Sequence, residues 1–545
     1  MFKVITVPTQ PFNDQKPGTA GLRKPVRIFQ QLHYLQNFIQ SSFDAIPSLK
    51  DGTLVIGGDG RYYNRESIAI LLNMAAANGV KKSIVGCKGL LSTPAASLLI
   101  PHVGAAGGFI LTASHNPGGA KGDFGIKLNV ANGGQASETS TNTIYQHSLA
   151  IARYLKLDTK TNIDLDRIGQ QMLGNMQIEI VDPVSHYTEV MERLFDFERI
   201  RKLLKSGLFH MRFDALHAVT GPYALEIFER RLGAPTGTVI HGAPSEDFAG
   251  CHPDPNPQDA EGFIKLFTGD NSPDFGAASD GDGDRNMILG RGLMVSPGDS
   301  LAVLTANAQL VPGYSAGLTG VARSLPTSHA VDRVAQKLGI TAYETPTGWR
   351  YFCNLLDAGL ITLCGEESFG TSSNHAREKD GMWAVLFWLN LIAARSESVG
   401  KILTKHWHEF GRDFFQREDY FIKDAGQAQT LMRLLGSRLG GLDDETFAGF
   451  TVQVADNFTY HDPVDNSTSR DQGLWLTTVG GGRIVYRLSG TGTRGAILRI
   501  YLEQYEPNPE LHNQTPAALL APLSRMARSL ARLESHGITT PTAIT

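Results

Sequence analysis

The sequence has few cysteines and no long apolar run. Its four cysteines stand far apart in 545 residues and form no CxxC pair, which is typical of ordinary thiols in a reducing compartment. They are Cys87, Cys251, Cys353 and Cys364. The longest strongly apolar stretch, residues 382–394, is interrupted by Asn390 and is too short to span a bilayer. The first residues also lack a secretory signal, so we expect a cytoplasmic protein without a membrane partner.

The chain also lacks a strong excess of charge of one sign. With 50 basic and 54 acidic residues the formal net charge is -4, which gives no indication of nucleic acid as a partner. Any phosphate site must therefore be a local basic pocket on a mildly acidic body. The length is too great for one hydrophobic core and favours three or four domains.

Three strand–helix–strand units follow one another, each with a polar loop after its first strand. Their strand pairs are expected at 53–56 and 83–86, at 211–215 and 238–240, and at 318–321 and 340–343. Asn64 is a candidate cap of the first helix, and Thr327 or Ser328 of the third. Polar loops at this place in α/β sheets commonly bind ligands.

The remaining segments complete the expected domain organisation. Residues 132–143 are polar and predict a surface loop, whereas 189–204 have helical spacing and open the second domain. After about residue 410, strand-like stretches precede a final helix capped by Thr515 and begun by Pro516. The sequence thus predicts α/β domains at 1–189, 190–297 and 298–408, and an α+β domain at 409–545.

The stretch GFILTASHNPGG places Ser114 and His115 on a tight loop at the end of a short apolar strand. An α/β sheet positions reactive groups in such a place. A turn serine that bonds its own backbone explains the local pattern equally well.

The segment SDGDGDRN alternates Asp280, Asp282 and Asp284 with glycines, so all three carboxylates can turn inward on one loop. Hard oxygen ligands with little bulk around them suit Mg²⁺. An EF-hand is excluded because Arg285 and Arg291 stand where its glycine and glutamate are required. The remaining alternative, a solvated acidic turn, would leave three like charges together without a cation.

The segment RLSGTGTRG formally matches GxGxxG, but a strand follows its glycines where a Rossmann site needs a helix. Hydroxyls and glycines flanked by Arg487, Arg494 and Arg499 suit a phosphate nest instead. A glycine-rich hairpin turn is the structural alternative.

Two further polar loops follow the third unit. CGEESFG places Glu366, Glu367 and Ser368 on a loop at a strand end, where carboxylates that bind no metal can accept hydrogen bonds from sugar hydroxyls. TPTGWR precedes it, with Trp349 more typical of a core residue than of a sugar platform. REKDG follows, and a surface ion pair would be the common fate of Lys379.

Near the N-terminus, KPGTAGLRK combines glycines with Arg23 and Lys24. Alone it is more typical of a surface loop than of an anion site.

In this order, the motifs TASHNPGG, DGDGDRN, TPTGW, CGEESFG, REKDG and RLSGTG resemble those of the α-D-phosphohexomutase superfamily, and of its glucose-specific phosphoglucomutases most of all. KPGTAGLRK, FDALHAVTGPY, HPDPNP, GVARSLPTS and GRDFFQREDY extend the resemblance over nearly the whole chain. The resemblance implies three mixed α/β domains and a C-terminal α+β, TATA-binding-protein-like domain around a central cleft. It implies reversible interconversion of α-D-glucose 1-phosphate and glucose 6-phosphate through a phosphoserine and glucose 1,6-bisphosphate, with one Mg²⁺ per chain.

The resemblance also implies roles for individual residues. Ser114, His115 and Lys379 match catalytic groups, and Ser114 joins Asp280, Asp282 and Asp284 as a metal ligand. The matched substrate-binding residues are Thr19, Arg23, Arg285, Thr347, Gly348, Glu366, Ser368, Lys379, Arg417, Arg487, Ser489, Gly490, Thr491, Gly492, Thr493 and Arg499. Hexose phosphates are the implied partners, and we expect a monomer or weak homodimer.

The departures from the family pattern are Arg350, Arg494 and the pair Ser373-Asn374. They leave the chemistry intact and bear on phosphate affinity. Two alternatives stay open at this point: a mutase for mannose or glucosamine phosphates, and a catalytically silent scaffold.

Overall fold

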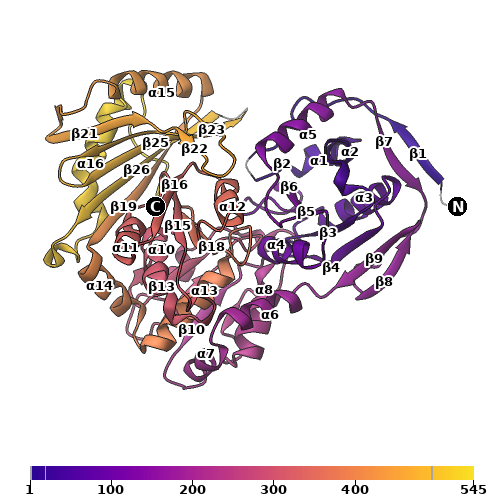
Figure 1. Cartoon of the computed structure of the whole chain (residues 1–545), viewed down its shortest axis with the longest axis horizontal. Helices are drawn as coiled ribbons and strands as arrows, with labels where there is room; N and C mark the ends of the chain where they lie inside the picture. The colour runs from indigo at the N-terminus through magenta and orange to yellow at the C-terminus, as the bar shows by residue number, and fades with distance from the viewer. Residues whose placement is uncertain (1–2, 19, 493–494) are drawn as a thin grey trace.

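The structure, a computed structural model, describes residues 3–18, 20–492 and 495–545. Four sheets follow one another along the chain and are called here the first to fourth sheet. Figure 1 shows the first sheet at one end of the molecule and the fourth at the other, with the second and third between them. In the described part of the chain no helix is long and apolar enough to cross a membrane.

The first sheet has the strand order β2-β6-β5-β3-β4-β9-β8. Its strands are β2 (Leu22–Pro25), β3 (Thr53–Gly58), β4 (Lys82–Leu90), β5 (Gly107–Leu111), β6 (Asp123–Val130), β8 (Gly169–Leu173) and β9 (Met176–Val181). Strands β5, β3, β4 and β9 are parallel and β6 is antiparallel to β5. A separate antiparallel pair is formed by β1 (Lys3–Pro8) and β7 (Arg153–Asp158).

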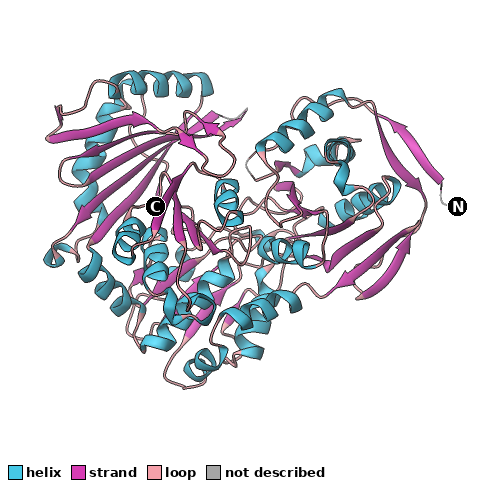
Figure 2. Cartoon of the chain, viewed as in Figure 1, coloured by secondary structure: helices cyan, strands magenta, loops and turns pink. Residues whose placement is uncertain are grey.

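Helices cover both faces of the first sheet (Figure 2). Along β3, Leu54 and Ile56 join one hydrophobic cluster while Val55 joins another, because successive strand residues point to opposite faces. The helices are α1 (Val26–Phe29), α2 (Tyr34–Ala45), α3 (Asn64–Ala77), α4 (Thr93–His102) and α5 (Glu138–Ala150). The turn η1 (Pro47–Leu49) follows α2.

The second and third sheets repeat the same plan on a smaller scale. The second sheet has the order β11-β10-β12-β13-β14, and the third β16-β15-β17-β18. Their strands are β10 (Met211–Asp214), β11 (Val239–Ile240), β12 (Phe275–Ala278), β13 (Met287–Gly290), β14 (Leu293–Met294), β15 (Gly320–Ser324), β16 (Thr341–Thr345), β17 (Leu363–Glu366) and β18 (Gly370–Ser373). As β5 precedes an antiparallel β6, so β12 precedes an antiparallel β13 and β17 an antiparallel β18.

The helices around these two sheets share one core with the first sheet. Val55, Tyr223, Leu301 and Trp388 all belong to the same cluster, so the first three sheets are packed into one continuous body. The helices are α6 (Ser185–Leu194), α7 (Phe197–Leu204), α8 (Thr220–Ala224), α9 (Glu261–Lys265), α10 (Pro297–Ala306), α11 (Ala330–Leu338), α12 (Trp349–Asp357), α13 (Gly381–Arg395) and α14 (Val399–Phe410). Helix α8 continues into the π-helix η2 (Leu225–Arg231), and the short 3-10 turns are η3 (Phe248–Gly250), η4 (Ala308–Leu310) and η5 (Pro312–Tyr314).

The fourth sheet is antiparallel throughout its order β20-β21-β24-β25-β26-β19-β27. Its strands are β19 (Arg412–Ile422), β20 (Thr446–Phe447), β21 (Phe450–Asn457), β24 (Leu474–Thr478), β25 (Gly482–Gly492), β26 (Gly495–Glu506) and β27 (Ala543–Ile544). A small pair, β22 (Tyr460–His461) and β23 (Thr468–Ser469), stands beside it. Its helices are α15 (Ala425–Leu439) and α16 (Pro516–Leu530), and its turns η6 (Pro509–Leu511) and η7 (Glu534–His536).

Successive side chains of β26 point alternately to the two faces of the fourth sheet. Leu498 and Ile500 pack with α15 and α16 in one cluster, whereas Tyr501 packs with Leu325 of the third unit. Arg499 therefore shares the face that carries Tyr501 and is turned away from the helices.

Several local expectations are corrected by the structure. Asn64 is the first residue of α3, and its side chain bonds the Gly89 carbonyl instead of capping the helix. Neither Thr327 nor Ser328 caps α11, whose N-cap is His329. The segment 189–204 is not one helix, because α6 ends at Leu194 and α7 starts at Phe197 after a cap by Asp196.

The expected surface loop at 132–143 is wrong in its second half. Ser137 accepts a hydrogen bond from the Ser140 amide and starts α5 at Glu138. Strand β19 and helix α15 were not recognised in the sequence. The final helix is confirmed, with Thr515 as cap and Pro516 in its first turn.

Candidate active site

The loop that joins β5 to β6 presents Ser114. Its Oγ donates to Asp280 Oδ2 at 2.8 Å and lies 3.3 Å from His115 Nδ1. The residue has a left-handed φ of 52°, which is uncommon for a residue other than glycine. The expected position of the serine, on a turn after a buried strand, is confirmed.

The loop that joins β12 to β13 holds the three aspartates. Ligand oxygens of Asp280, Asp282 and Asp284 all lie within 4.8 Å of one another, and all three residues are buried. Burial and the two neighbouring carboxylates raise the pKa of Asp280 well above its ordinary value. Oδ1 of Asp282 and Oδ1 of Asp284 are buried without a hydrogen-bond partner in the described residues. Buried, mutually repelling oxygens with unsatisfied lone pairs fit a divalent cation.

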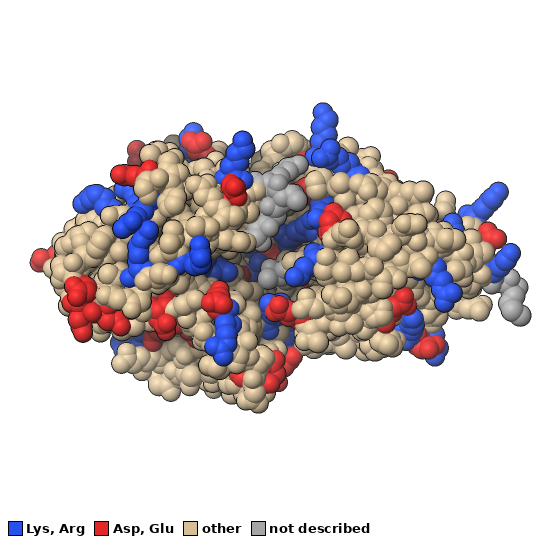
Figure 3. All heavy atoms as spheres, turned by 90° about the horizontal axis from the view of Figure 1, so that it is seen from above, with Lys and Arg blue, Asp and Glu red and all other residues tan. Residues whose placement is uncertain are grey.

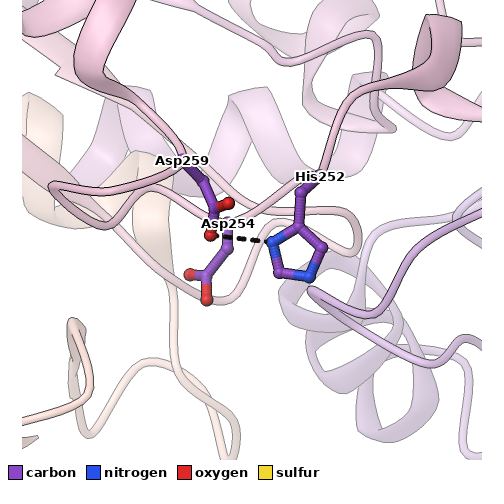
Figure 4. Close-up of side chains that lie close together, drawn as sticks. All are labelled: His252, Asp254 and Asp259. Atoms are coloured by element: carbon purple, nitrogen blue, oxygen red, sulfur yellow. Dashed lines mark hydrogen bonds and ion pairs between the residues drawn. The ribbon is translucent and has the colours of Figure 1, made fainter. Parts of the chain in front are cut away.

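A second group with metal-ligand chemistry lies nearby but already has its own partners (Figure 4). His252 Nδ1 lies 2.8 Å from Asp259 Oδ2, and Asp254 accepts from Arg285 Nη1 at 3.0 Å. Asn256 donates to the same Asp259 oxygen at 2.6 Å. Arg285 balances the charge of Asp254, and Asp259 is hydrogen-bonded by His252 and Asn256, so the carboxylates of this cluster are already occupied by protein partners.

The loop that joins β17 to β18 carries the glutamates. Glu366 accepts from the Gly348 amide at 3.1 Å and from Ser368 Oγ at 3.4 Å. Thr347 Oγ1 is buried beside them without a hydrogen-bond partner in the part of the chain described. Trp349, the first residue of α12, is a core residue as expected.

Lys379 connects the glutamate loop with the aspartate loop. Its Nζ lies 3.5 Å from Asp284 Oδ2 and 3.9 Å from Glu366 Oε2. Burial acts to lower the pKa of Lys379, but the carboxylates of Asp284 and Glu366 outweigh burial and raise it. The surface ion pair considered for this lysine is therefore wrong.

Arg23 and His115 complete the same centre. Arg23, on β2, is partly buried, and burial lowers its pKa although the charges of Asp282 and Asp284 oppose that effect. Its Nε has no hydrogen-bond partner among the residues described. Burial, followed by the charges of Arg285, Arg23 and Lys379, lowers the pKa of His115 well below its ordinary value.

The fourth sheet contributes a row of arginines on the face away from its helices. Arg487 on β25 lies directly opposite Arg499 on β26, and Asp419 on β19 lies opposite Arg499. Arg417 donates to Glu367 Oε2 at 3.3 Å, which joins this face to the glutamate loop. Two arginines opposite each other on one face repel unless an anion lies between them.

The glycine-rich segment at the tip of this face is a hairpin, as its strand pattern indicated. Ser489 and Gly490 lie on β25, which pairs with β26. The backbone of Thr491 and Gly492 forms the end of β25. The predictions on Thr19, Thr493 and Arg494 lie outside the described residues.

Viewed from above, the molecule is hollowed between the end that holds the first sheet and the end that holds the fourth (Figure 3). Lys and Arg side chains gather in this hollow on a surface otherwise mixed in charge. This hollow has the basic character that we expect of a phosphate site on a mildly acidic protein.

Sequence reasoning missed several buried residues that hold these loops. Thr93 Oγ1 donates to Asp282 Oδ2 at 2.6 Å, and Lys127 Nζ lies 3.9 Å from the same oxygen. Lys127 also lies 3.2 Å from Glu378, the neighbour of Lys379 in sequence. Asp59 and Arg61 lie behind Ser114. A charged residue flanked by apolar ones within a strand, as Lys127 is by Ile126 and Leu128 in β6, was the available signal.

A serine beside a three-carboxylate loop, with arginines across a hollow, is typical of enzymes that transfer phosphoryl groups. Four family profiles match the chain: phosphoglucomutase/phosphomannomutase α/β/α domain I at residues 14–154, domain II at 185–292, domain III at 297–410, and the phosphoglucomutase-1 C-terminal domain at 412–542. The chain belongs to the phosphoglucomutase/phosphomannomutase family. The expected three α/β domains followed by a distinct C-terminal domain are thereby confirmed.

Relatives match over the full length. A phosphoglucomutase of Rhizobium radiobacter is 53% identical over 99% of this chain and 100% of its own. Phosphoglucomutase-1 of Oryctolagus cuniculus is 47% identical over 100% of both chains. The crystal structure of parafusin, a phosphoglucomutase from Paramecium in an open form, has a TM-score of 0.92 and 45% identity and covers 99% of both chains.

Proposed function

We propose that this chain is a phosphoglucomutase that interconverts α-D-glucose 1-phosphate and glucose 6-phosphate through a phosphoserine and glucose 1,6-bisphosphate. The observation that carries the proposal is the contact of Ser114 Oγ with Asp280, because it joins a nucleophilic hydroxyl to the loop suited to a cation. The full-length match to proteins named phosphoglucomutase supports glucose as the sugar.

In this mechanism Ser114 carries the travelling phosphoryl group. A sugar hydroxyl attacks phosphorus and gives its proton to a protein base, while the P–O bond to Ser114 breaks and the serine oxygen leaves with a proton from a protein acid. His115, beside the serine, and Lys379, held at the aspartate loop, are the proposed groups that move these protons. Because the reaction gives a bisphosphate, the sugar must turn over so that its second phosphate faces Ser114.

The three aspartates, with a phosphoserine oxygen, are the proposed ligands of Mg²⁺. When bound, the cation would neutralise charge on the transferring phosphoryl group. Arg23 and Arg285 would add positive charge at the same centre. Thr93 and Lys127 hold Asp282 from behind and keep the loop in place.

The substrate-binding roles are divided between the third and fourth sheets. Glu366 would accept hydrogen bonds from sugar hydroxyls, and Ser368 would exchange hydrogen bonds with them. Both residues lie next to Thr347 and Gly348. Arg417, Arg487 and Arg499, with the segment Ser489–Thr493, would hold the phosphate that is not reacting. Domain boundaries near residues 189, 297 and 408, a cytoplasmic location and a monomer or weak homodimer stay predictions.

Turnover with glucose 1-phosphate, Mg²⁺ and a trace of glucose 1,6-bisphosphate tests this function. We expect Ser114→Ala to abolish turnover. It should also abolish the mass gain of one phosphoryl group that we expect intact mass spectrometry to detect in the wild type. Ser83→Ala, which changes another buried serine of the first sheet, serves as the control and should keep both. Full activity of Ser114→Ala would overturn the proposed role of the serine.

A panel of glucose, mannose and glucosamine phosphates tests the substrate. We expect the highest kcat/KM for the glucose phosphates. A higher value for mannose or glucosamine phosphate would assign the alternative mutase activity. No turnover of any sugar phosphate by a folded, Mg²⁺-loaded protein would favour a silent scaffold.

A further inference from the structure

Arg61 is a fully buried arginine behind the serine loop. It stands between β3 and α3, in the segment GGDGRYY, and 1% of its surface is exposed. A buried guanidinium needs its charge balanced and its N–H groups bonded. Asp59, two residues earlier and equally buried, balances the charge through contacts of 3.1 and 2.8 Å to Arg61 Nε.

The outer nitrogens of Arg61 bond backbone carbonyls of the serine loop. Nη2 donates to the Ser114 carbonyl at 2.6 Å. Nη1 donates to the Asp123 carbonyl at 3.0 Å and to the Asn116 carbonyl at 3.3 Å. One side chain therefore ties together the start, the middle and the end of the turn between β5 and β6.

The other side of the Ser114 residue is tied to the same ion pair. Its amide donates to Thr112 Oγ1 at 2.7 Å, and that hydroxyl donates to Asp59 Oδ2 at 2.6 Å. Both the N–H and the C=O of Ser114 are thus fixed by the Asp59–Arg61 pair. Such constraints from both sides can hold a serine at a left-handed φ that an unconstrained chain would leave.

The second unit closes over this arrangement. A β-carbon built on Gly281 would lie 2.4 Å from the Ser114 carbonyl oxygen and 3.4 Å from Arg61 Nη2. Phe248 covers the guanidinium with its ring centroid 5.3 Å away. The carbonyl that Arg61 holds is therefore also the surface on which the aspartate loop rests.

We propose that Arg61 is a positioning residue that sets the distance between Ser114 Oγ and the aspartate loop. It touches no substrate and acts through the Ser114 carbonyl. A shift of about 1 Å at the reacting atoms can cost roughly a hundredfold in rate. The inference rests on the proposed function, because the effect of an Arg61 variant is measured as a change in mutase activity.

Arg61→Lys tests the inference, because an ammonium keeps the charge beside Asp59 but cannot reach three carbonyls with a planar fork. We expect kcat to fall roughly a hundredfold while KM for glucose 6-phosphate changes less than twofold. The rate of phosphoryl uptake on Ser114 from glucose 1,6-bisphosphate should fall by the same factor. A purely structural arginine would lower the melting temperature without this split between kcat and KM.

Arg323→Lys is the matched control. Arg323 is also buried, and its main partners are the carboxylates of Asp332 and Glu344. We expect this variant to lose stability and to keep its kcat within twofold. Wild-type kcat in Arg61→Lys, or an equal fall of kcat in Arg323→Lys, would overturn the inference.

Two additional measurements cover the cases in which Arg61→Lys does not fold or the wild type shows no mutase activity. If Arg61→Lys does not fold, Asp59→Asn replaces it, because it keeps Arg61 and only loosens its anchor. A smaller fall in kcat at unchanged KM supports the inference, and wild-type kcat overturns it. A crystal structure of the variant reports the Ser114 Oγ to Asp280 distance without any assay: an increase supports positioning even if the wild type proves inactive, which would overturn only the proposed function.

Discussion

Gly370 lies against the side chain of Lys379: a β-carbon built on Gly370 would come within 2.2 Å of Lys379 Cδ and 3.0 Å of its Cγ. Gly370 begins β18, immediately after the glutamate loop. The missing side chain at this position leaves the space that the lysine stem occupies between Asp284 and Glu366.

Gly370→Ala should therefore displace Lys379 with little effect on the fold. We expect kcat to fall roughly tenfold while the melting temperature changes by only a few degrees, since the displaced group is a flexible side chain. Gly262→Ala is the control, because the added methyl group would meet nothing within 4 Å in α9. Unchanged kcat in Gly370→Ala would show that the position of Lys379 does not limit turnover.

Asp284→Asn should remove most of the stability that the protein gains from Mg²⁺. In EDTA its melting temperature should stay near that of the wild type, because the relief of repulsion from Asp280 and Asp282 is offset by the loss of the ion pair with Lys379. With Mg²⁺ present, the wild type should gain stability and the variant should gain much less. Thermal unfolding in EDTA and in Mg²⁺ measures both effects.

Asp259→Asn is the matched control for this experiment. Asp259 belongs to the second cluster, where His252 and Asn256 already form hydrogen bonds with it. Its replacement should leave the gain of stability from Mg²⁺ unchanged. A loss of that gain in Asp259→Asn, but not in Asp284→Asn, would move the cation site to the second cluster.

Arg499→Met should weaken the hold on the non-reacting phosphate. Arg499 faces Arg487 across the hairpin, and its Nε is buried without a hydrogen-bond partner in the described residues. Losing one hydrogen bond to a charged group costs about 2 kcal/mol, or roughly thirtyfold in kcat/KM. Steady-state kinetics with glucose 1-phosphate and glucose 6-phosphate measures this fall in kcat/KM.

Arg525→Met provides the comparison for Arg499. Arg525 is exposed on α16, on the helix-covered side of the same sheet. Its loss should leave kcat/KM within twofold. Equal losses in the two variants would indicate a general effect of surface charge instead of a phosphate site.

His406, which is buried on α14, should make the protein sensitive to acid. Burial lowers its pKa from an ordinary 6.5 to about 4, an effect that outweighs the opposing charge of Glu409. The folded state then keeps the ring neutral while the unfolded state takes up a proton below pH 6.5. Stability is full above that pH and falls as the pH drops towards 4, by at most about 3 kcal/mol.

Denaturant unfolding between pH 7 and 4 measures this contribution. His406→Gln should flatten the acid dependence of the unfolding free energy by that amount. His408→Gln, an exposed histidine of the same helix, should not change it. The same slope in His406→Gln as in the wild type would assign the acid sensitivity to other groups.

Much of the fold could be predicted because local patterns carry it. The apolar run 108–111 ending in a turn gave β5 and the exposed serine, and Thr515-Pro516 gave the start of α16. Strand β19 was missed because Arg417, Glu418 and Asp419 interrupt its apolar pattern. Those charges are tolerated only because Arg417 meets Glu367 of another sheet and Asp419 pairs with neighbouring arginines.

The sequence by itself determined the residue types at the site: a serine on a turn, alternating aspartates, and hydroxyls and glycines among arginines. Each is a local pattern, set by neighbours a few positions apart. Only the tertiary structure decided that Ser114 meets Asp280 across 166 positions, that Lys379 is a largely buried link instead of a surface ion pair, and that Arg61 lies behind the serine. The physical reason is that burial and charge pairing arise when distant strand ends come together, and no short stretch of chain encodes them.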